Sequence, residues 1–146
     1  MKDKMIIGSI EVCDLPDLGI SDLQIRVDTG AKTSSLHVDN LQKFTKGGKP
    51  WVRFDIHPDV YDIEKVASCE CAIHDVRSVK SSNGVAEERY VIKTSLCLGG
   101  ESWPIHITLT NRADMSYLML FGRQGMGERV LVDPSQTFLL SKNSDS

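Results

Sequence analysis

Apolar and polar residues alternate along most of this chain, and a period of two residues is the pattern of half-buried β-strands. The alternation is found at 5–13, 23–27, 51–57, 88–98, 103–109 and 137–140. Glycine and proline pairs, such as Gly99-Gly100 and Asp133-Pro134, separate these segments. A short helix is indicated only at 123–128. The pattern therefore predicts an all-β domain that is folded over or closed, with one short helix near its C-terminus.

Length and composition are those of one globular domain. The 146 residues are 40% hydrophobic and 25% charged, which is enough apolar material for a core. No internal repeat or linker interrupts the chain, so we expect one domain over 1–140. The small polar residues of 141–146 are expected to form a flexible tail.

Charge and apolar run length exclude several classes of function. The net charge is −3 and the pI is about 5.8, which does not favour binding to nucleic acid or to an anionic membrane. No apolar run approaches the roughly 20 residues needed to span a bilayer. The N-terminus shows no signal peptide, so we expect a cytoplasmic protein. Its four cysteines are then expected to be reduced: Cys13, Cys69, Cys71 and Cys97.

The strand at 23–27 ends in Asp28-Thr29-Gly30-Ala31. Taken alone, these residues are typical of a turn. Their surroundings favour chemistry, because an apolar strand leads in and the segment Leu120-Phe121-Gly122-Arg123 follows far downstream. This combination resembles the retropepsin-like aspartic proteases. In that family a strand delivers the catalytic aspartate, and a second apolar strand ending in glycine packs beneath its loop. The resemblance implies a closed retropepsin-like β-barrel.

The resemblance assigns roles to these residues. Asp28 would activate a water molecule, Gly30 would permit close backbone approach and donate its N–H to the carboxylate, and Thr29 would tie two active-site loops together. Ala31, Gly122 and Arg123 would support the loop. Two carboxylates must share one proton, so that one acts as base and the other as acid. The chain has a single Asp-Thr-Gly, so the second aspartate would come from another copy in a homodimer.

Longer motifs narrow the resemblance. The run 28–37 is similar to the signature of the bacterial "ATP-dependent zinc proteases", a retropepsin-like family linked with an ATP-grasp ligase that adds glutamates to a ribosomal protein. The stretches 77–84, 110–115 and 120–123 are also similar to that family, and the likeness covers about 8–140. It implies a peptide or protein substrate and a functional link to the glutamate ligase.

One departure from the viral retropepsins concerns the brace of the active site. In the viral enzymes the Gly-Arg pair is followed by Asn or Asp, and the arginine pairs with an acidic residue just after Asp-Thr-Gly-Ala. Gln124 and Lys32 occupy these places here, so the same salt bridge cannot form. An alternative therefore stays open: a non-catalytic module on the same fold that binds peptide or regulates a ligase.

A hairpin is predicted between strands at 69–76 and 88–96, since Ser81-Ser82-Asn83-Gly84 lies between them and Asn-Gly favours tight turns. It is either an exposed surface hairpin or a flap over substrate, to which Arg77 and the four turn residues would contribute. Basic residues crowd it: Arg77, Lys80, Arg89 and Lys93. If the hairpin covers substrate, that substrate is expected to be acidic.

No metal or nucleotide cofactor is predicted. The chain has no His-Glu-x-x-His, and the pair Cys69 and Cys71 has no second pair to complete a structural zinc site. The remaining zinc candidates are His37, His57, His74 and His106. Gly47-Gly48-Lys49-Pro50 is not a Walker loop, so any ATP dependence would come from a partner. A Ser-His-Asp arrangement of Ser34, Ser35, His37 and Asp28 lacks the Gly-x-Ser-x-Gly elbow.

Overall fold

The computed structural model describes residues 4–57, 66–80, 84–111 and 117–140. The strands are β1 (Met5–Ile7), β2 (Ile10–Leu15), β3 (Ile20–Val27), β4 (Ser34–His37), β5 (Asp39–Lys46), β6 (Lys49–Ile56), β7 (Ala67–Ala72), β8 (Asp75–Lys80), β9 (Ala86–Leu98), β10 (Glu101–Thr110), β11 (Met119–Phe121) and β12 (Val130–Val132). They are accompanied by a 3₁₀ turn, η1 (Pro16–Leu18), and the short helix α1 (Arg123–Met126). The predicted all-β class with one short helix is confirmed.

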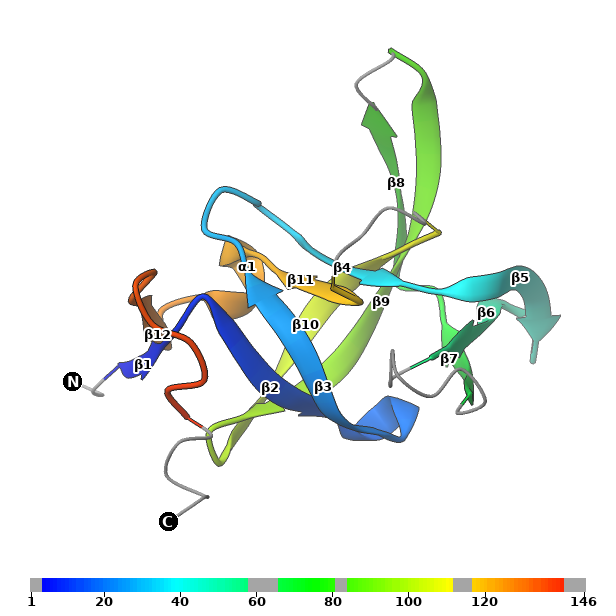
Figure 1. Cartoon of the computed structure of the whole chain (residues 1–146). Helices are drawn as coiled ribbons and strands as arrows, with labels where there is room; N and C mark the ends of the chain where they lie inside the picture. Colours follow the sequence, from blue (N-terminus) through cyan, green and yellow to red (C-terminus); the bar gives the residue numbers. More distant parts are fainter. Residues whose placement is uncertain (1–3, 58–65, 81–83, 112–116, 141–146) are drawn as a thin grey trace.

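Six strands close into a barrel (Figure 1). They are hydrogen-bonded in the order β10-β4-β11-β3-β2-β9, and β9 pairs again with β10 to close the ring. β8 adds to β9 outside the ring, and the two strands extend as an arm beyond the barrel. A three-stranded sheet, β5-β6-β7, and a two-stranded sheet, β1-β12, lie beside it.

The two-residue period explains the core. In β3 the side chains of Leu23, Ile25 and Val27 are buried, whereas Gln24 and Arg26 between them are exposed. Similar alternation in β9 and β10 fills the barrel from the other side, with fully buried side chains such as those of Ile92, Leu96 and Ile107. Within the described residues, no helix is long and apolar enough to cross a membrane.

The predicted boundaries of one strand and of the helix are wrong. The expected strand at 69–76 is two strands, β7 and β8, and β8 runs on to Lys80. The expected helix at 123–128 ends at Met126, because Gly127 takes a φ of +55° and caps it. The expected tail, 141–146, lies outside the described residues, as does most of the motif at 110–115.

The apolar segment 137–140 is not a strand, contrary to the prediction. Phe138 has a φ of +53°, which breaks an extended run. The cause is Glu11, whose fully buried carboxylate accepts N–H groups from Gly8 at 2.7 Å, Leu139 at 2.9 Å and Leu140 at 3.3 Å. A buried carboxylate needs such donors, and the C-terminal segment curls to supply them.

Candidate active site

Asp28 follows β3 directly and is held at both its backbone and its carboxylate. Its backbone N–H donates to the Phe121 carbonyl at 3.0 Å. Its Oδ1 accepts the N–H of Gly30 at 3.0 Å, and its own carbonyl accepts the N–H of Ala31 at 3.2 Å. The side chain is half-buried, whereas Thr29 and Gly30 are exposed. The loop therefore orients a carboxylate at the surface of the barrel.

β11 lies between the strand that enters this loop and the strand that leaves it. It pairs in parallel with β3, with Phe121 opposite Val27, and antiparallel with β4, with Met119 opposite Leu36. The predicted packing of a second apolar strand beneath the loop is therefore present. Phe121 and Met119 are fully buried in the barrel core. Their packing therefore fixes the position of Asp28 at the end of β3.

Gly122 ends β11 where only glycine fits. A Cβ at this position would lie 2.5 Å from the carbonyl oxygen of Thr33 and 3.0 Å from that of Ala31. The N–H of Gly122 donates to the hydroxyl of Ser34 at 3.0 Å, and Ser34 is fully buried. The loop between β3 and β4, residues 28–33, is called the aspartate loop below. Hydrogen bonds to Phe121 and Gly122 hold its two ends at the junction of β11 and α1.

Arg123 holds the loop through hydrogen bonds to backbone carbonyls, and no acid among the described residues forms an ion pair with it. Its Nη1 donates to the carbonyl of Thr29 at 2.9 Å, and its backbone N–H donates to the carbonyl of Ala31 at 2.9 Å. The backbone N–H of Gln124 donates to the carbonyl of Lys32, also at 2.9 Å. The viral ion pair is replaced by a hydrogen bond from guanidinium to a backbone carbonyl, so the loss of the acid at position 32 does not leave the loop unsupported.

Helix α1 is anchored by a residue that sequence reasoning missed. Trp103 in β10 is buried, and its indole N–H donates to the carbonyl of Gly125 at 2.8 Å. A Cβ on Gly125 would lie 2.7 Å from the Phe121 ring and 3.0 Å from the Ser34 hydroxyl. The alternating pattern around Trp103 marked it only as a core residue, because nothing in the sequence indicates a backbone acceptor.

The predicted hairpin is the β8–β9 arm. Its register runs from Asp75 opposite Val91 to Lys80 opposite Ala86. Gly84 is exposed with a φ of +84°, and the other predicted flap residues, Ser81, Ser82 and Asn83, lie outside the described residues. Hydrogen bonds bring together Asp28, Thr29, Gly30, Ala31, Gly122 and Arg123. Arg77 belongs to β8, which Figure 1 shows in the arm that extends beyond the barrel.

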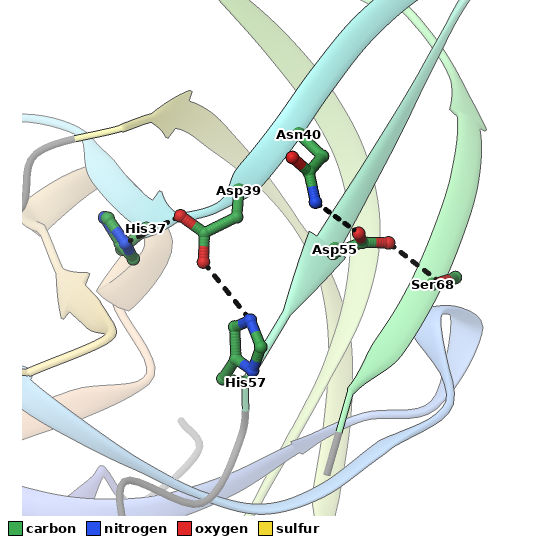
Figure 2. Close-up of polar contacts among 6 residues, drawn as sticks. All are labelled: His37, Asp39, Asn40, Asp55, His57 and Ser68. Carbon is green, nitrogen blue, oxygen red and sulfur yellow. Dashed lines mark hydrogen bonds and ion pairs between the residues drawn. The ribbon is translucent and has the colours of Figure 1, made fainter. Parts of the chain in front are cut away.

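The zinc candidates fall into separate places. His37 and His57 both approach Asp39, at 3.6 and 3.4 Å between Nε2 and carboxylate oxygen (Figure 2). The rings of His74 and His106 stack at 4.4 Å between centroids. Among the residues with described positions, no group of three or more His, Cys, Asp or Glu side chains is arranged to hold a metal ion.

Burial also affects the remaining nucleophiles. It raises the pKa of the Cys69 thiol to about 11 and that of Cys71 to about 12, so both thiols are protonated at neutral pH and are weak nucleophiles. All four cysteines are free thiols. Ser34 is buried and bonded to Gly122, which argues against a role as a serine nucleophile.

The closed barrel and the aspartate loop above β11 define a retropepsin-like fold. The chain belongs to the RimB-like family, described as retropepsin-like aspartic endopeptidase RimB, whose profile matches residues 6–143. The chain is similar to a solved structure of a protein with unknown function from Legionella pneumophila. The TM-score is 0.77 and the identity is 32%, over 94% of this chain and 99% of that one.

Curated relatives carry a different name. Two proteins called "Probable alpha-L-glutamate ligase" match, one from Shewanella pealeana and one from Parasynechococcus marenigrum. The first is 46% identical over a region that covers 98% of this chain and 31% of the relative. The second is 48% identical over a region that covers 92% of this chain and 29% of the relative. The chain thus spans less than a third of the length of these relatives.

Proposed function

We propose that this chain is an aspartic peptidase that acts as a homodimer, with one Asp28 from each copy. The observation that carries the proposal is the geometry of Asp28: a half-buried carboxylate at a strand end, oriented by the Gly30 N–H at 3.0 Å. The loop is fastened from below by β11, Gly122 and Arg123. Membership of a family of retropepsin-like endopeptidases supports the same chemistry.

The proposed mechanism needs two such carboxylates and a water molecule. Like charges a few ångströms apart cannot both ionise readily, so the pair keeps one proton. The ionised Asp28 takes a proton from water, whose oxygen attacks the carbonyl carbon of the peptide, while the protonated Asp28 of the second copy donates its proton to the carbonyl oxygen. The tetrahedral intermediate then collapses as its C–N bond breaks. The first Asp28 gives its proton to the leaving amine, and the second Asp28 takes back a proton from a hydroxyl of the intermediate, which becomes the carboxylic acid. The Gly30 N–H stabilises the ionised carboxylate. No cofactor enters this scheme.

The proposed substrate is an extended peptide that lies between the aspartate loop and the β8–β9 arm. The arm and its base carry the cations Arg77, Arg89 and Lys93, which are offset by the acids Asp75, Glu87 and Glu88 on the same strands. The proposal that the peptide is acidic therefore rests on the ligase names of the relatives. The ligase names of the relatives support a functional link to glutamate ligation, and we place both activities in the cytoplasm.

Peptidase assays of the purified chain test the proposal. Asp28→Asn should abolish hydrolysis, because the amide keeps the shape of the side chain but cannot hold the shared proton. Glu101→Gln is a matched control, since Glu101 is an exposed carboxylate at the start of β10. Specific activity of the wild type should also rise with protein concentration until the dimer dominates. Full activity in Asp28→Asn would refute the proposal.

A second candidate is a module that regulates a ligase without hydrolysis. The observation that favours it is that the ligase-named relatives contain a region similar to this whole chain within one longer polypeptide. The two functions separate in one experiment, in which a glutamate ligase is assayed with wild type and with Asp28→Asn. An equal effect of both proteins on ligation, with no peptidase activity in either, would favour the regulatory module.

A further inference from the structure

Helix α1 connects the barrel wall to the aspartate loop. The backbone N–H groups of Arg123 and Gln124, at the start of the helix, donate to the carbonyls of Ala31 and Lys32, both at 2.9 Å. The Arg123 side chain donates to the carbonyl of Thr29, also at 2.9 Å. The N-terminal N–H groups of a helix have no partner inside it, and here the loop accepts them. The position of the loop therefore depends on the position of α1.

The helix is too short to hold its own position. It has four residues, and isolated helices shorter than about 12 residues are marginal in water. The last carbonyls of a helix also lack partners inside it. The N–H of Arg129, four residues after Gly125, donates to the carbonyl of Met126 at 3.1 Å instead of to Gly125. The Gly125 carbonyl must therefore find its donor outside the helix.

Trp103 is the donor, and the barrel holds it firmly. Its indole N–H reaches the Gly125 carbonyl at 2.8 Å, and its side chain is only 5% exposed. In the pairing of β10 with β9, Trp103 lies opposite Leu96, which is fully buried. The guanidinium of Arg129 covers the indole ring at 5.1 Å. A side chain fixed in the barrel wall thus holds the C-terminal end of α1.

We propose that Trp103 is a positioning residue for Asp28, acting through the Gly125 carbonyl and helix α1. The inference rests on the proposed function. Trp103 holds one end of α1, and the other end holds three carbonyls of the aspartate loop. Within that loop the N–H of Gly30 donates to the Asp28 carboxylate at 3.0 Å. A displacement of α1 therefore moves the group that orients the carboxylate, and small errors in the position of a catalytic group cost much of the rate.

Two variants of Trp103 test the inference in the full chain. Trp103→Phe keeps an aromatic ring and removes the N–H, and 3-benzothienylalanine at the same position puts sulfur in place of the N–H at nearly the same ring size. Each is assayed at concentrations at which its specific activity no longer rises. Both should lower kcat about tenfold and leave KM within about twofold, because the surface that binds peptide is untouched. A wild-type kcat in both variants would overturn the inference.

Two control variants separate positioning from a general loss of stability. Trp51→Phe changes the other tryptophan of the chain, which packs against Phe44 in the β5-β6-β7 sheet. Phe54→Leu removes part of a fully buried side chain in β6 and should lower the melting temperature at least as much as Trp103→Phe. Both controls should keep the kcat of wild type. An equal loss of kcat in Phe54→Leu would overturn the inference, because the loss would then follow stability alone.

The amide proton resonance of Gly30 tests the same contact without turnover. A hydrogen bond to a carboxylate moves this resonance downfield, so a longer bond in Trp103→Phe should move it upfield, whereas Trp51→Phe should leave it in place. An unchanged Gly30 resonance in Trp103→Phe would overturn the inference. An upfield shift in a protein whose wild type hydrolyses no peptide would support the link from Trp103 to Asp28 and refute the proposed function alone.

Discussion

Gly122→Ala is the substitution that most sharply tests how the aspartate loop is held. The φ of Gly122 is −93° and its ψ is 175°, an extended conformation that alanine adopts freely, so the backbone itself is not strained. The added Cβ would lie 2.5 Å from the Thr33 carbonyl oxygen. Ordinary contact begins near 3.4 Å, so loop and strand must separate by about 0.9 Å. No side-chain rotation relieves this clash, because the opposing atoms are backbone.

The losses of stability and of catalytic rate in Gly122→Ala both follow from that displacement. Forcing one methyl group into a packed site costs about 2 kcal/mol, which lowers the melting temperature of a domain of this size by about 6 °C. A shift of nearly 1 Å in a catalytic group costs about a hundredfold in rate. We therefore expect Gly122→Ala to fold with reduced stability and to lose peptidase activity out of proportion to the stability it loses.

Calorimetry and peptidase assays on the same preparations measure both effects. Gly100→Ala is the control: Gly100 has a φ of +83° and nothing lies within 4 Å of the added Cβ, so this variant should show backbone strain of about 1 kcal/mol with normal activity. A Gly122→Ala variant with the stability and activity of wild type would show that the β11–α1 junction does not fix the loop.

Three further results are expected. Glu11→Gln should lower stability by about 2 kcal/mol, because its amide N–H₂ would face the backbone N–H groups of the 137–140 segment; unchanged unfolding by urea would contradict this. Hydrogen bonds from Asn40 and Ser68 lower the pKa of Asp55 below 3.8 (Figure 2), so they add stability above pH 3.8 that is lost as pH falls through the lowered pKa. The stability deficit of Ser68→Ala should therefore shrink in acid, and a deficit that grows as pH falls would refute this reading. Chelation with EDTA should leave peptidase activity unchanged. A loss of activity with EDTA that added zinc restores would contradict the proposed aspartic mechanism.

Much of the fold could be predicted because the barrel strands have one buried and one exposed face. In the segment 23–27, buried and exposed residues alternate. The end of that alternation marked Asp28 as the residue that follows the strand. β5 was missed because its two apolar residues, Leu41 and Phe44, are three positions apart and so do not alternate with a period of two. The apolar run 137–140 was misassigned because its conformation depends on Glu11, a buried acid more than a hundred residues away.

The candidate site was predictable in its side chains and not in its backbone contacts. Asp28, Gly30, Gly122 and Arg123 were marked by residue type and order, and the structure places them together. The acceptor of the Arg123 side chain is the carbonyl of Thr29, a group that every residue carries and that leaves no trace in the sequence. The role of Ser34 is hidden for the same reason, since its partner is the N–H of Gly122.

Mixing wild type with Asp28→Asn tests the central claim of a shared dyad most directly. The two proteins are combined in varying ratio at constant total concentration, allowed to exchange, and assayed for peptidase activity. If each site needs one Asp28 from both copies, mixed dimers are inactive. Activity should then follow the square of the wild-type fraction, with about one quarter remaining in an equal mixture. Activity that falls in simple proportion to the wild-type fraction would contradict the shared dyad.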